Sequence, residues 1–309
     1  MSGKYATERL SANTLGVARA ADLLRGGGIV AVPTETVYGL AARADDPDAI
    51  ARIYAAKGRP DFNPLIVHVA SREAAERLVE ISASASELAE AYWPGPLTLV
   101  LPRRRDAGLA DAVSAGLPTL ALRCPAHPLM RAVIEAVGAP LAAPSANRSG
   151  FVSPTTAEHV LATLDGRIDA VLDAGPCAAG LESTIVAVRD DGRLDVLRPG
   201  PLAIAGAGLA VGEIEAPGQL ASHYAPGKPL RLEASCAQDG EFLIGFGSMS
   251  GDCTLSAAGD VAEAASRLYA CLHLAARAPQ PRIAVASIPR EGLGIAINDR
   301  LRRAAAPCP

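Results

Sequence analysis

The chain has 309 residues, of which half are apolar and 20% are charged, with a net charge of −4 at pH 7. This length allows one large or two medium domains with a sizeable buried core. The acidic balance and the aromatic content of only 4% argue against a broad basic face that grips nucleic acid. No apolar run predicts a membrane span, and the charged beginning of the sequence is unlike a signal peptide, so we expect a cytoplasmic protein.

Helices and strands alternate along the first two hundred residues. Helical patterns cover residues 14–24, 48–56, 73–79, 86–92, 128–137 and 155–164. Short apolar runs predict strands at 29–32, 65–69, 97–101, 120–123, 141–143, 170–172, 183–188 and 195–197. Glycines 26–28 are typical of a helix end, and Thr155 and Glu158 have the spacing of a capping box. This alternation predicts an α/β domain built around a twisted sheet.

Glycine and proline interrupt this pattern between residues 206 and 229, which predicts a linker. Beyond the linker, we expect strands at 241–246 and 282–287 and helices at 260–276 and 295–305. These elements predict a smaller α/β domain. We therefore divide the chain into a large domain at 1–212, a linker or lid at 213–229 and a small domain at 230–309.

The six cysteines are scattered singly, with no C-x-x-C pair and no zinc-ligand spacing. A chain of this length does not need disulfides to stabilise its core, so we expect reduced, structural cysteines. The five histidines form no metal pattern either. We expect no metal held by protein side chains.

Two tripeptides stand out, Lys57–Arg59 and Ser145–Asn147, and each lies just beyond an apolar stretch. Fixed cations beside hydroxyl and amide groups are suited to holding a polyphosphate. The usual nucleotide-binding glycine motifs are missing, since no G-x-x-x-x-G-K-[ST] occurs and the nearest G-x-G-x-x-G has one spacer residue too many. Taken alone, Lys57 and Arg59 would more often be solvated charges at a helix end.

Other polar residues occupy similar places at strand ends. Residues 34–36 directly follow the first strand, residues 182–184 precede another and Arg198 follows one. For residues 34–36, a turn that satisfies its own backbone groups is the simpler explanation. Arg123 ends an apolar strand, where a buried guanidinium needs a carboxylate or phosphate partner. His68 is a candidate for the same site, and no G-x-S-x-G, Cys–His or H-E-x-x-H pattern indicates covalent or zinc catalysis.

Six motifs lie in a fixed order: PTETVYGL (33–40), KGRPDFNPL (57–65), WPGPLT (93–98), APSAN (143–147), ESTIV (182–186) and LRPG (197–200). Together they closely resemble the threonylcarbamoyl-AMP synthases, whose catalytic domain has the YrdC-type fold. The tail, with SHYAP (222–226) and GLGIAINDR (292–300), resembles the extra domain of the long, two-domain form. The resemblance implies a YrdC-like twisted mixed sheet with flanking helices, followed by a smaller Rossmann-like α/β domain.

The resemblance also implies a nucleotidyltransferase that makes threonylcarbamoyl-AMP and pyrophosphate from L-threonine, bicarbonate or CO2, and ATP, with Mg²⁺ carried on the ATP. A downstream threonylcarbamoyl transferase complex would then modify the adenosine next to the tRNA anticodon. Direct tRNA binding by this chain would be weak or absent, and no membrane would be involved. Such a reaction needs no enzyme nucleophile, which suits a sequence that lacks one.

Carried over position by position, the resemblance implies roles for individual residues. The L-threonine pocket would consist of Thr34, His68, Arg123, Ala143 and Ser183. ATP would be contacted by Lys57, Arg59, Asn63, Thr119, Ser145, Asn147, Ser153, Arg198 and Tyr224. The catalytic residues among them would be Lys57, Arg59, Ser145 and Asn147. Because Tyr224 lies in the predicted linker, we expect residues 219–229 to close over the site as a lid.

Two other interpretations remain open. A double-stranded RNA or tRNA-binding module without catalysis would use Arg148 and the run Arg103–Arg105, although such a run is more often a solvated loop. A carbamoyl-transfer enzyme of the hydrogenase-maturation type uses a related domain. Those proteins are much longer and carry zinc-finger cysteines, which this chain lacks.

Overall fold

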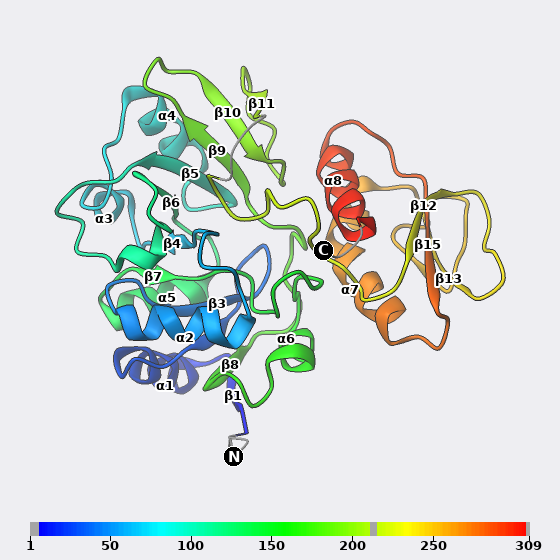
Figure 1. The fold of residues 1–309 in the computed structure, drawn as a ribbon, viewed down its shortest axis with the longest axis horizontal. Coiled ribbons are helices and arrows are strands. Elements are labelled where there is room, and N and C mark those ends of the chain that lie inside the picture. Colours follow the sequence, from blue (N-terminus) through cyan, green and yellow to red (C-terminus); the bar gives the residue numbers. More distant parts are fainter. Residues whose placement is uncertain (1–5, 211–214, 307–309) are drawn as a thin grey trace.

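The computed structural model describes residues 6–210 and 215–306, which form two α/β units with separate sheets (Figure 1). The large unit contains an 11-stranded mixed sheet, and the small unit contains a 4-stranded sheet whose strands are all parallel. The predicted fold class, a twisted mixed sheet with flanking helices followed by a smaller α/β unit, is confirmed.

The large sheet has the strand order β1-β8-β2-β3-β7-β4-β6-β5-β9-β10-β11. Its strands are β1 (Glu8–Ser11), β2 (Val30–Val32), β3 (Gly39–Arg43), β4 (Ile66–His68), β5 (Leu97–Pro102), β6 (Thr119–Arg123), β7 (Leu141–Ala142), β8 (Ala170–Asp173), β9 (Thr184–Val188), β10 (Leu194–Arg198) and β11 (Gly208–Leu209). The helices of this unit are α1 (Thr14–Arg25), α2 (Pro47–Lys57), α3 (Arg72–Glu76), α4 (Ala83–Tyr92), α5 (Pro128–Val137) and α6 (Ala157–Leu164), with a 3-10 turn at Asp111–Val113.

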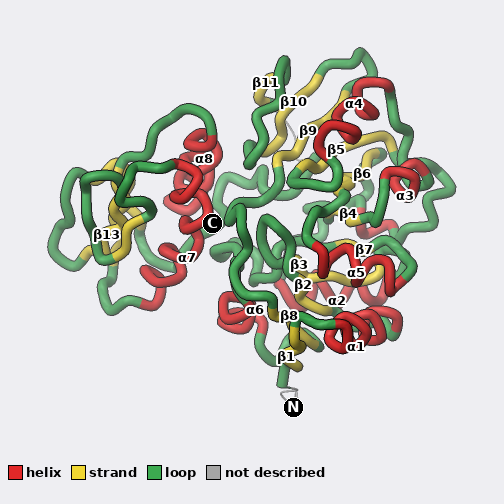
Figure 2. The backbone as a smooth tube through the Cα atoms, turned by 180° about the vertical axis from the view of Figure 1, so that it is seen from behind, coloured by secondary structure: helices red, strands yellow, loops and turns green. Residues whose placement is uncertain are grey.

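The small unit has the strand order β12-β15-β13-β14. Its elements are β12 (Leu230–Ala234), β13 (Glu241–Gly245), β14 (Cys253–Thr254), α7 (Val261–Arg277), β15 (Arg282–Ala286) and α8 (Leu293–Ala305). Figure 1 and the reverse view in Figure 2 both place α7 and α8 between the small sheet and the large unit. The helices of the small unit therefore face the large unit.

Strand β2 shows how the large sheet is buried on both faces. Val30 and Val32 belong to an apolar cluster with Leu24 of α1, whereas Ala31 belongs to the cluster that contains Ile50 of α2. Alternate side chains of a strand point to opposite faces of its sheet. This two-sided burial explains the continuous apolar run that predicts the strand.

Helix α2 shows how local sequence positions one part of the site. The Asp46 side chain accepts hydrogen bonds from two backbone N–H groups of the first turn, and Pro47 occupies the start of the helix. Gly58 ends the helix with φ 59°, a left-handed conformation that glycine adopts at little cost. This sharp end fixes the directions of Lys57 and Arg59, both of which are buried.

The sequence patterns do not predict several short strands, namely β1, β3, β11, β12 and β14. Strand β3, for example, has the sequence GLAAR, without the β-branched residues that favour strands. Antiparallel pairing with both β2 and β7 holds it in the sheet. Long-range pairing has here overridden a weak local preference.

The prediction of reduced cysteines is wrong for one pair. Cys253 and Cys271 form a disulfide that links β14 to α7, with their Cα atoms 6.1 Å apart. A separation of 18 residues matches no pattern that would predict a disulfide from the sequence. The fold of the small unit brings the two cysteines together. The free cysteines among the described residues are Cys124, Cys177 and Cys236, and Cys308 lies outside those residues.

The predicted linker contains no helix or strand between residues 215 and 229, and residues 211–214 lie outside the described part. The domain boundaries at 212 and 229 stay predictions. No helix in the described part of the chain is long and apolar enough to cross a membrane.

Candidate active site

A row of polar side chains crosses one edge of the large sheet. Strands β4 and β6 are parallel, and their register places His68 opposite Arg123. Strand β5 runs the other way and places Thr98 beside Arg123. The Thr98 hydroxyl lies 2.7 Å from that of Ser183, which directly precedes β9. Strand β10 is antiparallel to β9 and ends at Arg198, so the sheet gathers side chains from five strands at one edge.

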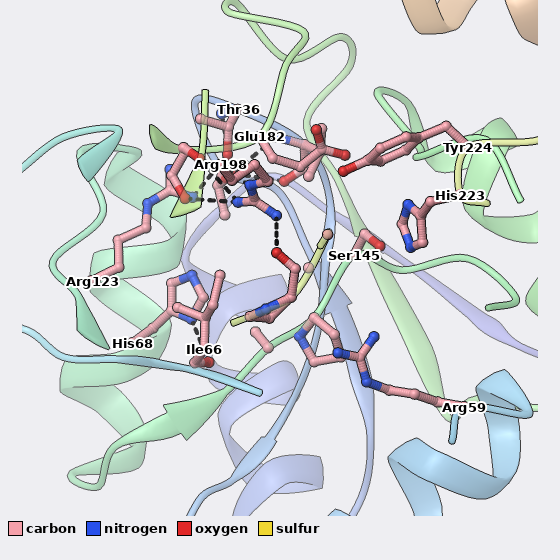
Figure 3. Close-up of a pocket in the computed structure, with 18 residues that line it drawn as sticks. Thr36, Arg59, Ile66, His68, Arg123, Ser145, Glu182, Arg198, His223 and Tyr224 are labelled. Atoms are coloured by element: carbon pink, nitrogen blue, oxygen red, sulfur yellow. Dashed lines mark hydrogen bonds between the residues drawn. The ribbon is translucent and has the colours of Figure 1, made fainter. Parts of the chain in front are cut away.

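Of these side chains, His68, Arg123, Ser183 and Arg198 line a cavity of about 40 Å³ (Figure 3). The predicted site residues that line it are Thr34, Arg59, His68, Arg123, Ala143, Ser145, Ser183, Arg198 and Tyr224. Figure 3 shows His68 and Arg123 on one side, and Arg59 and Tyr224 on the other. We define the Arg123 side as Thr34, His68, Arg123 and Ala143, and the Arg59 side as Arg59, Ser145, Arg198 and Tyr224.

On the Arg123 side, the guanidinium already has protein partners. Arg123 donates to the Glu35 carboxylate at 2.6 Å and to the Thr36 hydroxyl at 2.9 Å. Burial favours the neutral form of Glu35, but the charge of Arg123 and the hydrogen bonds that the carboxylate accepts together lower the pKa of Glu35. Arg123 is only 4% exposed, and Glu35 is the carboxylate partner that the sequence predicts for such a buried guanidinium.

The hydroxyl of Thr34 takes part in a local turn, as the simpler explanation of residues 34–36 predicts. It donates to the carbonyl of Val37 at 2.7 Å and lies 2.8 Å from the Thr36 hydroxyl. A contact with a ligand would therefore have to share or replace these bonds.

His68 is buried at the end of β4. Burial, together with the charge of Arg123, lowers the pKa of its imidazole to about 3. The ring is therefore neutral near pH 7, with its Nδ1 atom 3.2 Å from the carbonyl of Ile66. A neutral ring can exchange hydrogen bonds with a ligand without adding charge to the Arg123 side.

On the Arg59 side, two buried guanidinium groups donate to neutral oxygens. Arg59 donates to the carbonyls of Asn63 at 3.1 Å and Pro64 at 2.7 Å. Arg198 donates from Nε and Nη2 to the carbonyl of Ser183 and from Nη2 to its hydroxyl, at 3.0–3.1 Å. Burial lowers the pKa of Arg59 to about 10. Buried cations that have no carboxylate partner among residues 6–210 and 215–306 are suited to an anionic ligand.

Lys57 lies beneath the cavity instead of lining it. Its ammonium donates to the backbone carbonyls of Ser145 and Asn147, and its side chain is almost fully buried. Burial and the nearby charge of Arg59 lower the pKa of Lys57 well below its ordinary value. Lys57 therefore holds the loop after β7 in place.

Several buried polar atoms near the Arg59 side have no hydrogen-bond partner among the described residues. They are the Oδ1 atoms of Asn63 and Asn147, Nδ1 of His223 and the hydroxyl of Tyr224. A buried polar atom without a partner costs about 1–3 kcal/mol. Such a group of unpaired atoms indicates a site that is completed by a bound molecule.

The segment predicted as a lid covers this side of the cavity. Tyr224 is fully buried with φ 63°, and the N–H of Ala225 donates to the carbonyl of Gly150 at 2.7 Å. Gly218 has φ 89°, and a Cβ atom there would lie 2.8 Å from Cδ of Arg198. Only glycine lets the segment pass this close to Arg198.

Comparison with known proteins agrees with this geometry. A family model described as telomere recombination, Sua5/YciO/YrdC, matches residues 22–200, and a model of the threonylcarbamoyl-AMP synthase C-terminal domain matches residues 186–306. The threonylcarbamoyl-AMP synthase of Bacillus subtilis is 41% identical, over 97% of this chain and 95% of the relative. The chain belongs to the threonylcarbamoyl-AMP synthase family.

Other family members agree. The threonylcarbamoyl-AMP synthase of Pyrococcus abyssi is 38% identical over 92% of each chain. The crystal structure of Pyrococcus abyssi Sua5 complexed with L-threonine has a TM-score of 0.88 and 35% identity, covering 97% of this chain and 98% of that one. The family membership and enzyme class predicted from the motifs are confirmed, in preference to an RNA-binding module.

Some predicted site residues of this synthase do not line the cavity, namely Lys57, Asn63, Thr119, Asn147 and Ser153. Asn147 donates to the carbonyl of Phe151 at 2.7 Å, and Ser153 donates to Glu182 at 2.5 Å, so both brace the wall. Thr119 begins β6, four residues and about 13 Å from Arg123 at the other end of the strand. The contact of Thr119 with ATP stays a prediction.

Sequence reasoning gave no role to several residues that line the cavity of this synthase. They are Thr36, Pro217, Gly218, Glu182 and His223. Glu182 and His223 each stand beside a predicted site residue within a quoted motif, which is the signal that could have identified them. Pro217 and Gly218 carry no such signal, because only the path of the linker brings them to Arg198.

Proposed function

We propose that this chain synthesises threonylcarbamoyl-AMP and pyrophosphate from L-threonine, bicarbonate or CO2, and ATP. The observation that carries the proposal is the pair Arg59 and Arg198, two buried cations whose hydrogen bonds within the described part of the chain all go to neutral oxygens at the wall of a shared cavity. A triphosphate would supply the missing negative charge. Relatives named threonylcarbamoyl-AMP synthase, and a relative complexed with L-threonine, support the choice of substrates.

L-Threonine would bind on the Arg123 side. Arg123 would receive its carboxylate, while Thr34, His68, Ala143 and Ser183 would surround the rest of the amino acid. The neutral state of His68 suits this role, because a second cation beside the amine would oppose its approach. The guanidinium offers a rigid fork of donors that fits a carboxylate.

The reaction then needs positioning more than covalent catalysis. The threonine amine adds to CO2, a nitrogen–carbon bond forms, and the amine loses a proton to give a carbamate. A carbamate oxygen attacks the α-phosphorus of ATP, and the bond to the β-phosphate oxygen breaks, so that pyrophosphate leaves with the electron pair. Arg59 and Arg198 would stabilise charge on the phosphates, and Lys57 would hold Ser145 and Asn147 beside them.

Mg²⁺ would be carried by the triphosphate. No group of three or more His, Cys, Asp or Glu side chains in the described part of the chain could hold a metal ion. Glu182 is the carboxylate that lines the cavity, and its oxygens already accept bonds from Ser153, Tyr269 and Arg300. These residues fit a metal that arrives with ATP and helps to neutralise the phosphate charge.

The covering segment would exclude water from the carbamate, which readily loses CO2 when water supplies a proton. A cavity of about 40 Å³ has room for only about three water molecules. Entry of ATP and threonine would then require residues around Gly218 and Tyr224 to move away. We propose that the linker within 213–229 opens and closes the site between the domains at 1–212 and 230–309.

We also propose that the product passes to a downstream threonylcarbamoyl transferase complex that modifies tRNA in the cytoplasm, with weak or no direct tRNA binding by this chain. The arginine run supports the last point. Arg103 pairs with Asp111, and Arg104 pairs with Asp106, so two of the three guanidinium groups are engaged within the protein.

The test is pyrophosphate release from Mg²⁺–ATP by the purified full chain, with bicarbonate and each of the twenty amino acids in turn. We expect release that requires L-threonine and bicarbonate together. Release that is indifferent to threonine, from a protein shown to be folded, would contradict the proposal. Submicromolar tRNA binding with a steep salt dependence would then favour the RNA-binding alternative.

A further inference from the structure

Two side chains of the small unit reach the wall of the cavity in the large unit. The hydroxyl of Tyr269, on α7, donates to the Glu182 carboxylate at 2.8 Å. The Nε atom of Arg300, on α8, donates to the same carboxylate at 3.0 Å. Tyr269 and Arg300 are fully buried, and Glu182 is only 5% exposed. Three side chains from opposite sides of the junction thus share one buried polar cluster.

Glu182 is charged in this cluster. Burial alone would raise the pKa of its carboxyl, but the charges of Arg300 and Arg198, with the hydrogen bond from Ser153, lower it to about 2. The Arg300 guanidinium also donates to Asp299 at 2.9 Å and lies 5.4 Å from the centre of the Tyr224 ring. A buried carboxylate therefore has one close cation, Arg300, and a second cation, Arg198, within reach of its field.

The same carboxylate adjoins the residues expected to hold ATP. Ser153 donates to it directly at 2.5 Å. The next residue, Ser183, accepts the bonds that orient Arg198. Glu182 therefore links the helices of the small unit to the Arg59 side. Its described hydrogen-bond partners do not include Thr34, His68 or Arg123.

We propose that Arg300 and Tyr269 are positioning residues of the active site that act through Glu182 on the binding of ATP. The inference rests on the proposed function, because it assigns ATP to the Arg59 side. With Arg300 in place, the charge of Glu182 is neutralised from the small unit. Arg198 is then free to remain on Ser183 and to face the phosphates. Without Arg300, Glu182 would draw Arg198 toward itself and away from the nucleotide.

The test compares Arg300→Met with Arg302→Met in the full chain. Both changes remove a guanidinium from α8, but the Arg302 side chain is 69% exposed. We expect Arg300→Met to raise KM for ATP about tenfold or more, with little change in KM for L-threonine. Arg302→Met should match the wild type. Binding of the non-reacting analogue adenosine 5′-(α,β-methylene)triphosphate, measured by calorimetry, should weaken in parallel.

Two further variants separate positioning from a merely structural role. Glu182→Gln combined with Arg300→Met removes the charge that attracts Arg198, so ATP affinity should recover relative to Arg300→Met alone. Tyr269→Phe keeps the ring and removes one hydrogen-bond donor to Glu182. This variant tests the same role if Arg300→Met does not fold. We expect Tyr269→Phe to raise KM for ATP about threefold, again without an effect on KM for L-threonine.

Folded variants that bind ATP like Arg302→Met would overturn the inference. So would equal losses for ATP and threonine, or a double variant no better than Arg300→Met, because both would indicate general loosening. Wild-type protein that binds the analogue but releases no pyrophosphate with threonine would count against the proposed function instead. The variant comparison would still decide the role of Arg300 in that case.

Discussion

The imidazole ring of His159, on α6, stacks on that of His273, on α7, with the ring centres 3.8 Å apart. The two planes differ by 13°, and Nε2 of His273 donates to the carbonyl of Ser153 at 3.1 Å. Burial, with the charge of Arg277, lowers the pKa of His159 to about 4. Burial, with the charge of His159, lowers the pKa of His273 to about 3. The junction between the two units is therefore built on two neutral rings.

Because of this stack, we expect the protein to become less stable toward unfolding in acid. An imidazole in the unfolded chain titrates near pH 6.5, so the stability that comes from His159 and His273 is complete above that pH. It is lost as the pH falls from 6.5 toward 4, because the unfolded chain takes up protons first. We expect the melting temperature to drop by about 5 °C between pH 7.5 and 5.5.

The control for this prediction is His159→Phe, which keeps a ring in the stack but cannot be protonated. Its melting temperature should fall less between the two pH values. His68 and His223 also have lowered pKa values and contribute equally in both proteins. Equal falls in the variant and the wild type would contradict the role of the stack.

A second prediction concerns the approach of the linker to Arg198. Gly218→Ala places a methyl group where it would lie 2.8 Å from Arg198, at φ 89°. We expect the free energy of unfolding to fall by about 1 kcal/mol and KM for ATP to rise about tenfold. Gly227→Ala is the matched control, because Gly227 has φ 77° but nothing within 4 Å of the new Cβ. The control should lose stability alone; a similar KM for ATP in both variants would refute close approach as the cause.

A third prediction concerns the expected threonine carboxylate. Arg123→Lys keeps the charge but loses the rigid fork that now contacts Glu35 and Thr36. We expect KM for L-threonine to rise about 10- to 100-fold, with KM for ATP nearly unchanged. Steady-state pyrophosphate release measures both. Arg43→Lys, at a partly exposed pair with Asp45, should behave like the wild type. An effect on ATP instead of threonine would reassign Arg123.

A fourth prediction concerns Lys57. Lys57→Met leaves the buried carbonyls of Ser145 and Asn147 without their donor, so urea unfolding should show a loss of about 1–3 kcal/mol. Turnover should fall as well, because the loop after β7 loses its support. Lys228 similarly donates to two carbonyls at the end of α7. Lys228→Met should therefore cost stability to a similar degree but lower turnover less than Lys57→Met, and equal falls in turnover would contradict a local role for Lys57.

Much of the fold follows from local patterns. The structure places a helix at Pro128–Val137, as the sequence predicts, and the predicted strands at 97–101 and 120–123 differ from β5 and β6 by only one residue at an end. These segments have strong apolar periodicity and clear ends, so neighbouring residues decide their conformation. Local patterns could not predict strand β3 or the disulfide between Cys253 and Cys271, because each depends on a partner outside its own segment.

The site divides in the same way. Motifs identified Arg59, Arg123 and Arg198 as candidate ligands of an anion, and the structure gathers them around one cavity. The motifs did not indicate that Lys57 would donate to backbone carbonyls, or that Arg123 would already form an ion pair with Glu35. A motif specifies which groups are present, whereas the packing around them decides which atoms they meet.

Residue type and neighbours along the chain specify the strongly periodic helices and strands and the set of cations available to a ligand. The placement of His68 opposite Arg123, and the contact of Arg300 with Glu182 across 118 residues, depend instead on how distant segments pack together. Strand order and the docking of the small unit create these contacts. Such contacts depend on the burial of whole surfaces, which no local pattern encodes.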